Sequence, residues 1–274
     1  MYTTFSLYQI TDPDNLPFNP AMYSRLKFGD GHAARFFGRE LALRFIEEYG
    51  DLLLSEKEIV LIPSPYCTIP TASYSMTRFF KEEINWFLYV HGKKSMLDSK
   101  IHRYKTYSQD YGNLNYEERV NLIASDTYHL DAGFINNRVV LLIDDIKITG
   151  SHEYTIRKLV NASGVTGEFI FLYLAELTNP TVPANFENYL NYYEVKNLAG
   201  IQPLINDNSF IFNTRVIKYI LHSTDTQAFN EFLANTGRDK LHELVQYAIS
   251  NNYHLMEEYK NNLLKIIKQI TNGN

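Results

Sequence analysis

Residues 138–153 read RVVLLIDDIKITGSHE, and this stretch decides the fold of the chain. Its apolar run at residues 139–143 is dense in β-branched and aliphatic side chains, which is typical of a strand buried on both faces of a parallel sheet. Asp144 and Asp145 follow directly, and a short segment with hydroxyls and Gly150 comes next. Because a run with helical spacing begins after this glycine, the predicted order is strand, acid pair, loop and helix.

The loop and the acid pair suit different parts of one ligand. Backbone N–H groups of a tight loop that opens a helix converge where the helix dipole is positive, so a phosphate is stabilised there. Thr149 and Ser151 add hydroxyl donors. Asp144 and Asp145 would repel the phosphate, but they can accept hydrogen bonds from vicinal sugar hydroxyls, so the combined footprint suits a ribose 5-phosphate. The alternative is that the acid pair only ends a strand and caps a helix.

This stretch resembles the ribose-diphosphate signature of type I phosphoribosyltransferases, in which an apolar strand, two acids and two variable residues precede T-T-G-x-T. Ile148 and His152 stand where the signature has threonine, and the matching residues are Asp144, Asp145, Thr149 and Gly150. The resemblance implies that the two aspartates are catalytic and hold the ribose hydroxyls of phosphoribosyl diphosphate. It implies Mg²⁺ as cofactor, with Asp144 and Asp145 as indirect ligands through ribose hydroxyls or water. The residues expected to bind the 5-phosphate are Lys147, Ile148, Thr149, Gly150 and Ser151.

Composition excludes several classes of function. The 274 residues are 45% hydrophobic and 21% charged, as in an ordinary globular protein, and form one large domain or a domain with an appendage. The net charge of -5 gives no electrostatic footprint for nucleic acid or an anionic membrane. One cysteine allows no internal disulfide framework and no multi-cysteine metal site. With neither a signal peptide nor an 18-residue apolar stretch, we expect a cytoplasmic protein.

A second resemblance lies near the N-terminus. Residues 26–29 read L-K-F-G and residues 34–42 follow the pattern A-R-x-F-G-x-E-L-A, which is similar to the start of the competence-protein-F-like branch of the same family. The glycines of residues 23–31 indicate backbone that turns sharply or approaches another segment closely. Lys27 is predicted to bind substrate, at the diphosphate or the base, and the alternative is a solvated turn residue.

The run at residues 58–62 is a second buried-strand candidate, and residues 63–70, PSPYCTIP, follow it. In type I phosphoribosyltransferases the loop after this early strand holds the diphosphate, so the resemblance implies a binding loop here. Cys67 as a nucleophile would need a nearby base, and none is evident in the local sequence, so a small buried thiol is favoured. The substrate-binding residues predicted in this loop are Ser64, Tyr66, Cys67 and Thr68.

Residues 91–125 are the most polar part of the middle of the chain. Within them, Arg103, Lys105, Thr106 and Gln109 resemble the stretch R-x-R-x-T-x-x-Q of the competence-type branch, with spacing that differs by a residue or two, and in that branch the segment is a mobile flap that closes over the reaction centre. Closure would exclude water from a positively charged sugar. The resemblance implies that Arg103 and Lys105 are catalytic residues that meet the diphosphate. The alternative is a solvated surface loop.

Further along, residues 169–174 read as another buried strand, so strands alternate with helices, which predicts a parallel twisted sheet flanked by helices. The fold class expected is therefore α/β, of the type I phosphoribosyltransferase kind. Residues 1–180 would form this domain, including an N-terminal hood. Residues 181–274 carry several apolar stripes at helical spacing and are expected to form an added, mostly helical C-terminal subdomain, although the resemblance covers only residues 20–178.

The favoured hypothesis is an enzyme of nucleotide metabolism that transfers ribose 5-phosphate between phosphoribosyl diphosphate and a nitrogenous base. A second hypothesis is a sensor that binds phosphoribosyl diphosphate or a nucleotide without turnover, and a third is a pure interaction module. No nucleic acid or membrane is expected as a partner. The family implies a homodimer, and the C-terminal helices are a candidate surface for a protein partner. The sequence does not name the base.

Overall fold

The computed structural model describes residues 1–104 and 128–271. The strands are β1 (Tyr2–Ile10), β2 (Ile59–Pro63), β3 (Leu97–Asp98), β4 (Ile101–Arg103), β5 (Tyr128–Leu130), β6 (Arg138–Lys147) and β7 (Gly167–Leu177). The helices are α1 (Pro20–Lys27), α2 (Gly31–Leu53), α3 (Ala72–Val90), α5 (Ala132–Ile135), α6 (Ser151–Ala162), α7 (Phe186–Asn191), α8 (Leu198–Ile205), α9 (Thr214–Leu221), α10 (Thr226–Asn235), α11 (Arg238–Ser250), the 3₁₀ turn η2 (Tyr253–Leu255) and α12 (Glu257–Thr271).

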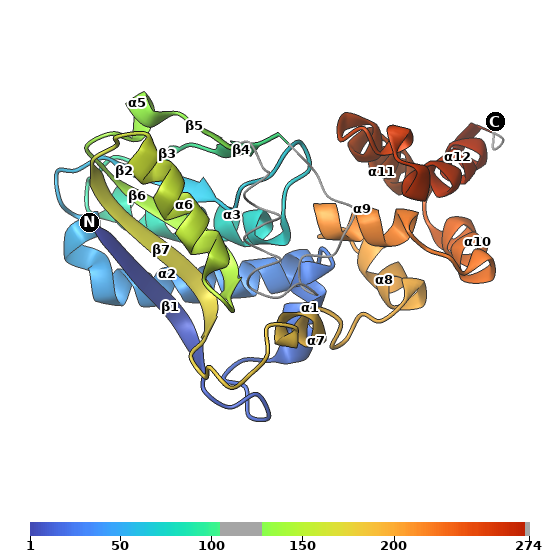
Figure 1. Cartoon of the computed structure of the whole chain (residues 1–274), viewed down its shortest axis with the longest axis horizontal. Helices are drawn as coiled ribbons and strands as arrows, with labels where there is room; N and C mark the ends of the chain where they lie inside the picture. Colours follow the sequence, from blue (N-terminus) through green and yellow to red (C-terminus); the bar gives the residue numbers. More distant parts are fainter. Residues whose placement is uncertain (105–127, 272–274) are drawn as a thin grey trace.

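A five-stranded sheet of order β1-β7-β6-β2-β3 forms the centre of the first part of the chain (Figure 1). All four neighbouring pairs are parallel, which confirms the predicted parallel α/β fold. The quoted stretch supplies β6, which lies between β7 and β2, so both of its edges are hydrogen-bonded and both of its faces are covered. The N-terminal segment is the edge strand β1 beside β7.

Helices cover the two faces of the sheet and divide its core into two layers. On one face, α2 and α3 pack over Val139, Leu141 and Ile143 of β6. On the other face, α6 packs over Val140 and Leu142 (Figure 1). Side chains of a strand alternate between faces with a period of two, so the two acids that follow residue 143 point to opposite faces of the sheet.

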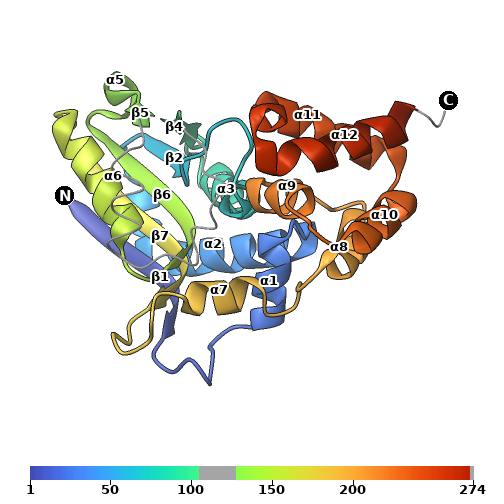
Figure 2. The same ribbon diagram turned by 45° about the vertical axis from the view of Figure 1, so that its right-hand side comes forward.

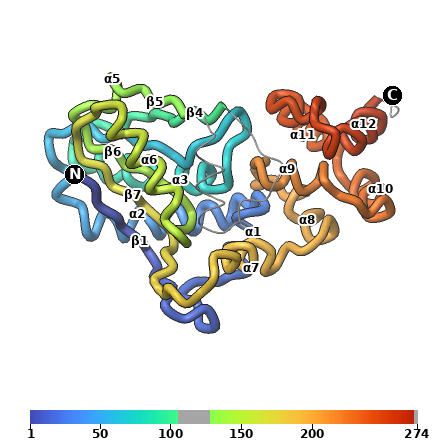
Figure 3. The backbone as a smooth tube through the Cα atoms, in the orientation of Figure 1, coloured from blue at the N-terminus to red at the C-terminus, as the bar shows by residue number. Residues whose placement is uncertain are grey.

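The C-terminal helices α8 to α12 build a second hydrophobic core, away from the sheet (Figure 2). This core also takes in Phe28 and Ile69 from the first part of the chain. The chain runs from its N-terminal strand in the sheet to α12, which lies at the opposite end of the molecule (Figure 3). These helices are present as expected, and the domain boundary at residue 180 stays a prediction. Among the described residues, no helix combines the length and the apolar character that crossing a membrane requires.

Helix α1 stands where the sequence indicated a sharp turn. Asn19 caps it, because its side-chain oxygen accepts hydrogen bonds from the backbone N–H groups of residues 21 and 22, and Pro20 takes the first helical position. The chain turns after the helix, at Gly29, whose φ is +89°. A Cβ on Gly31 would lie 2.0 Å from the carbonyl oxygen of Ser209, so the close approach expected of these glycines is made with the C-terminal part.

Candidate functional site

A cavity of about 200 Å³ opens where β2 and β6 end. The acid pair lines it, together with Arg103 of β4 and Tyr128 of β5. Three further groups of residues form its walls. The phosphate-loop wall consists of residues 146–153 and Tyr173. The hydroxyl wall consists of Ser64, Pro65, Thr71, Ala72 and Ser73. The helical wall consists of Lys27, Glu187 and Arg215, from α1, α7 and α9.

Asp144 points to the α6 face, as the alternation along β6 requires. Its Oδ2 lies 2.8 Å from Nδ1 of His152, and its Oδ1 accepts a hydrogen bond from the backbone N–H of Asp145 at 2.9 Å. Burial raises the pKa of Asp144, but the hydrogen bond and charge of His152 outweigh burial and bring the pKa below its usual range. Asp144 is therefore an ionised carboxylate at the edge of the cavity.

Asp145 points to the opposite face, toward α1. Its Oδ2 accepts hydrogen bonds from the Tyr23 hydroxyl, at 2.8 Å, and from the ammonium group of Lys27. All three residues are buried, so Lys27 is part of a buried ion pair and the alternative of a solvated turn residue is wrong. Burial raises the pKa of Asp145, Lys27 opposes this, and the charge of Asp144 adds to it, so the pKa moves upward overall. The two adjacent acids thus have pKa values shifted in opposite directions.

The loop between β6 and α6 has the geometry of an anion-binding turn. Gly150 is the N-cap of α6 and has a φ of +72°, a left-handed conformation that favours glycine. The Thr149 hydroxyl donates to the hydroxyl of Ser151 at 3.0 Å. The first backbone N–H groups of a helix have no acceptor within the helix, and the start of a helix favours an anion. In α6 the N–H of Ser151 donates to the Thr149 hydroxyl at 3.4 Å. Ile148, where the family signature has threonine, packs against the hydrophobic core on the α2 and α3 face.

Lys147 is engaged by two carboxylates. Its Nζ lies 3.1 Å from Oε2 of Glu153 and 2.9 Å from Oε1 of Glu176. Burial lowers the pKa of Lys147, but the hydrogen bonds that its ammonium group donates to Glu176 and Glu153, together with their negative charges, outweigh burial and raise the pKa overall. Because its charge is matched within the protein, Lys147 adds little to the positive potential of this loop, which comes mainly from backbone N–H groups.

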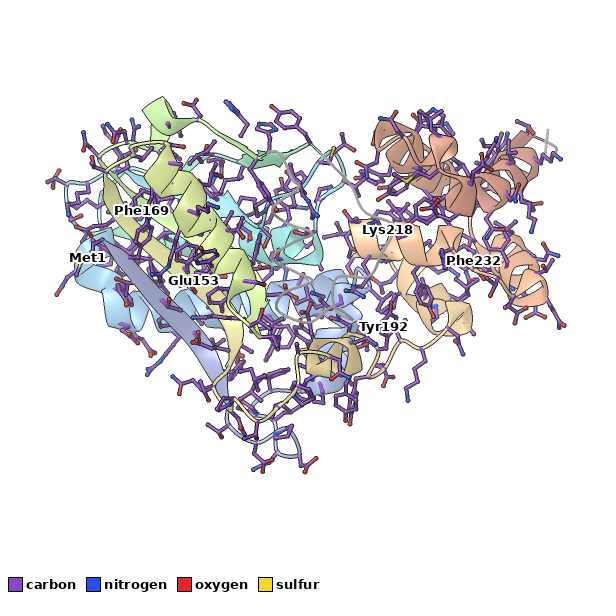
Figure 4. All side chains as sticks on the ribbon, viewed as in Figure 1. Met1, Glu153, Phe169, Tyr192, Lys218 and Phe232 are labelled. Carbon is purple, nitrogen blue, oxygen red and sulfur yellow. The ribbon has the colours of Figure 1, made fainter. Side chains whose placement is uncertain are left out.

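Glu153 holds the loop between β6 and α6 against the sheet. It is buried at the start of α6, against β7 (Figure 4). Its Oε2 accepts a hydrogen bond from the Tyr173 hydroxyl at 3.2 Å, and its Oε1 pairs with the guanidinium of Arg157 one turn further along α6. A buried carboxylate with this many partners fixes the first turn of α6 against the sheet.

The loop after β2 brings only part of its predicted residues to the cavity. Ser64 lines the cavity, whereas the next three predicted residues are not among those that line it. The ring of Tyr66 lies under Nζ of Lys100, 3.7 Å from its centroid, and the carbonyl oxygen of Cys67 accepts a hydrogen bond from the same Nζ at 2.8 Å. The Thr68 hydroxyl donates to Oδ1 of Asn251 at 2.7 Å. Substrate binding by Tyr66, Cys67 and Thr68 stays a prediction.

Of the two cationic residues predicted to be catalytic, only Arg103 is among the residues that the structure describes. Arg103 lines the cavity, and its backbone N–H donates to the carbonyl oxygen of Tyr66 at 3.3 Å. Lys105 lies outside the described residues, as does most of the predicted flap.

Sequence reasoning missed Tyr23, Glu187 and Arg215. Tyr23 stands four residues before Lys27, so recognising α1 as a helix would have placed both on one face. Glu187 and Arg215 have no comparable local signal, because their position beside the acid pair depends on how α7 and α9 dock against α1.

The carboxylates of the acid pair suit a hard cation that takes most of its oxygen ligands from a bound substrate. In the described part of the chain no group of three or more His, Cys, Asp or Glu side chains is placed to hold a metal ion. Asp144 and Asp145 nevertheless supply two carboxylates at the cavity, one of them firmly ionised. Mg²⁺ binds commonly in this way, through one or two carboxylates, substrate phosphates and water.

A family profile described as PRTase ComF-like matches residues 1–266, beyond the resemblance at residues 20–178 and through most of α12. No curated protein matches the chain. Among solved structures, a hypoxanthine phosphoribosyltransferase from Staphylococcus aureus has a TM-score of 0.34 and 14% identity, over 54% of this chain and 74% of that one. A Trypanosoma cruzi hypoxanthine phosphoribosyltransferase in complex with the product IMP has a TM-score of 0.35 and 15% identity, over 55% and 77%. A purine phosphoribosyltransferase from Pyrococcus horikoshii has a TM-score of 0.29 and 11% identity, over 52% and 84%.

Proposed function

The chain belongs to the ComF-like phosphoribosyltransferase family, and we propose that it binds phosphoribosyl diphosphate with Mg²⁺ and transfers ribose 5-phosphate to or from a nitrogenous base. One observation carries the proposal: the ionised Asp144 and the Gly150-capped start of α6 line the same cavity. A carboxylate for sugar hydroxyls and a helix N-terminus for phosphate are the two contacts that a ribose 5-phosphate needs.

Each wall of the cavity has a role in this reaction. The phosphate-loop wall binds the 5-phosphate, and Asp144 accepts hydrogen bonds from the ribose hydroxyls and steadies the positive charge that develops on the sugar. Ser64 of the hydroxyl wall and Arg103 face the diphosphate. When bound, Mg²⁺ would offset the charge of the leaving diphosphate, with Asp144 and Asp145 as its indirect protein ligands. Removing one such charge typically lowers the rate by about 10²- to 10³-fold.

Ligand binding tests this proposal most directly. We expect phosphoribosyl diphosphate with Mg²⁺ to give saturable heat when titrated into the full chain. Asp144→Asn removes the charge and keeps the shape, and it should weaken binding by about 10- to 100-fold, as expected for a hydrogen bond to a charged group. Asp51→Asn, an exposed change on α2, is the matched control and should bind as the wild type does. Absence of binding to the wild-type chain would refute the proposed function.

A non-catalytic sensor is the second candidate, and two observations favour it. Asp145 already holds Lys27 and Tyr23, and Lys147 already holds two glutamates, so both groups would have to leave partners in order to contact substrate. Turnover separates the two functions. An enzyme releases diphosphate when a base is supplied with phosphoribosyl diphosphate, whereas a sensor binds its ligand and releases none.

A further inference from the structure

The helical wall is built from three segments that lie far apart in the sequence. Lys27 comes from α1, Glu187 from the first turn of α7, and Arg215 from the first turn of α9. Neither of the other two walls includes a residue from the C-terminal helices. The C-terminal part therefore supplies a charged side chain to the cavity that holds the acid pair.

Helix α1 fixes α7 relative to the acid pair. Ser24 is fully buried, and its hydroxyl donates to the carbonyl oxygen of Asn191, at the end of α7, at 2.8 Å. The hydroxyl oxygen of Ser24 itself accepts hydrogen bonds from the backbone N–H groups of Glu194 and Val195, at 3.1 and 3.2 Å. On the same helix, Tyr23 and Lys27 bind Asp145. The position of Glu187 is thus tied to that of the acid pair through a single short helix.

Helix α9 is also fixed relative to α1. Asn213 is buried, caps α9 by accepting from the Val216 N–H, and donates to the carbonyl oxygen of Lys27 at 3.2 Å. Thr214 donates to the carbonyl oxygen of Ile69 at 2.8 Å. Arg215 follows directly, with its guanidinium 5.6 Å from the centroid of the Tyr192 ring. Its backbone cannot shift without breaking these buried hydrogen bonds, so the residue is preorganised beside the cavity.

Glu187 and Arg215 line the same cavity as Asp145, and the Arg215 guanidinium also donates to the Tyr192 hydroxyl at 3.4 Å. Two positive and two negative side chains thus line this part of the cavity: Lys27 and Arg215, Asp145 and Glu187. In agreement with this placement, burial and the charges of Asp145 and Glu187 raise the pKa of the Tyr23 hydroxyl, and Arg215 lowers it. A balanced set of donors and acceptors suits a neutral planar group with its own donor and acceptor, whereas a diphosphate carries several negative charges and requires an excess of positive ones.

We propose that the helical wall is the acceptor-base subsite and that Arg215 and Glu187 select a base with a carbonyl oxygen beside a ring N–H. This inference rests on the proposed function, which assigns the 5-phosphate and the diphosphate to the other two walls. The guanidinium of Arg215 donates to the carbonyl oxygen, as arginine commonly does to guanine. Glu187 accepts from the adjacent N–H. An amino group in place of the carbonyl would set donor against donor, so adenine is disfavoured.

Three probes and two variants test this assignment on the full chain. GMP carries the oxo edge, AMP carries the amino edge, and ribose 5-phosphate lacks a base. We expect GMP to bind at least about tenfold more tightly than AMP, the lower end of the effect of a hydrogen bond to a charged group. Arg215→Gln and Glu187→Gln should each weaken GMP binding by about 10- to 100-fold and leave ribose 5-phosphate binding unchanged. Lys218→Gln, on the same helix but outside the cavity lining, is the matched control.

Each other result overturns the proposal in a recognisable way. Equal binding of GMP and AMP to the wild type, or a preference that survives Arg215→Gln, would show that the helical wall does not read the base. A loss of ribose 5-phosphate binding in Arg215→Gln as large as the loss of GMP binding would assign Arg215 to the phosphates. Failure of the wild-type chain to bind ribose 5-phosphate and phosphoribosyl diphosphate would refute the proposed function itself, and this inference with it.

Discussion

The phosphate-loop wall and the helical wall line one cavity but arise in different ways. The first consists of one continuous stretch, residues 146–153, together with Tyr173 of β7, and the stretch lies within the sixteen residues that also contain the acid pair. The second joins residues 27, 187 and 215, which only the docking of α1, α7 and α9 brings together. A local wall can be recognised as a sequence motif, whereas an assembled wall leaves no motif.

The acid pair shows the same contrast at the scale of two residues. Asp144 pairs with His152, eight positions further along the chain. Asp145 pairs with Lys27, which is 118 positions away. Adjacent residues on one strand point to opposite faces, so Asp144 pairs with a residue of the phosphate-loop wall and Asp145 with a residue of the helical wall.

The largest loss of stability should come from removing Lys27 of the helical wall. Lys27→Met leaves the carboxylate of Asp145 buried without its cation, which typically costs about 3–5 kcal/mol of unfolding free energy. Lys57→Met removes the exposed pair with Glu168 and should cost at most about 1 kcal/mol. Urea denaturation of both variants measures the difference. Equal costs would show that the Lys27 pair contributes no more than a surface pair.

A smaller loss is expected where α2 meets the C-terminal part. Gly31→Ala would place a Cβ 2.0 Å from the carbonyl oxygen of Ser209, and overpacking of this kind costs about 1–3 kcal/mol. Gly237→Ala is the control, since no atom lies within 4 Å of its added Cβ, and it should change stability by at most about 0.5 kcal/mol. Thermal unfolding compares the two. If Gly31→Ala were as stable as the control, the close docking of residues 31 and 209 would be wrong.

The contribution of Asp144, which pairs with the phosphate-loop wall, should depend on pH. The pKa of Asp144 is lowered in the folded protein, so its stabilising contribution is complete above its unfolded value of about 3.9 and is lost as the pH falls toward the folded value. We expect Asp144→Asn to cost about 2 kcal/mol of unfolding free energy at pH 6. The difference between wild type and variant should shrink as urea titrations move from pH 6 to pH 3. A difference that grows toward low pH would contradict the assigned direction.

The smallest effects are expected for Thr68 and Thr71, which follow β2 and differ in whether they line the cavity. Thr68→Val removes the hydrogen bond to Asn251 and should cost about 1 kcal/mol of stability without changing the affinity for phosphoribosyl diphosphate. Thr71→Val, in the hydroxyl wall, should weaken that affinity instead. Calorimetric titration of both variants decides the matter. Weaker binding by Thr68→Val would support the sequence-based prediction that Thr68 contacts substrate.

Much of the fold followed from the sequence because its signals are local. The apolar run at residues 139–143 predicted a doubly covered parallel strand, and β6 is that strand. The strand at residues 169–174 and the helix after Gly150 were likewise readable, as β7 and α6. Helix α1 was missed, because the glycines at 29 and 31 drew attention to a turn and a close approach. The structure has both, a turn at Gly29 and close contacts with residues 209–211, but they follow a helix.

The sequence by itself determined the parallel sheet, the acid pair and the phosphate loop, since strand periodicity, charge and helix-terminus chemistry act within about ten residues. It did not determine that Asp144 and Asp145 have different partners, nor that Arg215 reaches the cavity. Those features were decided by the packing of α1 at the end of β6, where Tyr23 and Lys27 bind Asp145, and against α7 and α9, where Ser24 and Asn213 form buried hydrogen bonds between distant segments. Such contacts depend on the shapes of whole elements, so only the tertiary structure decided them.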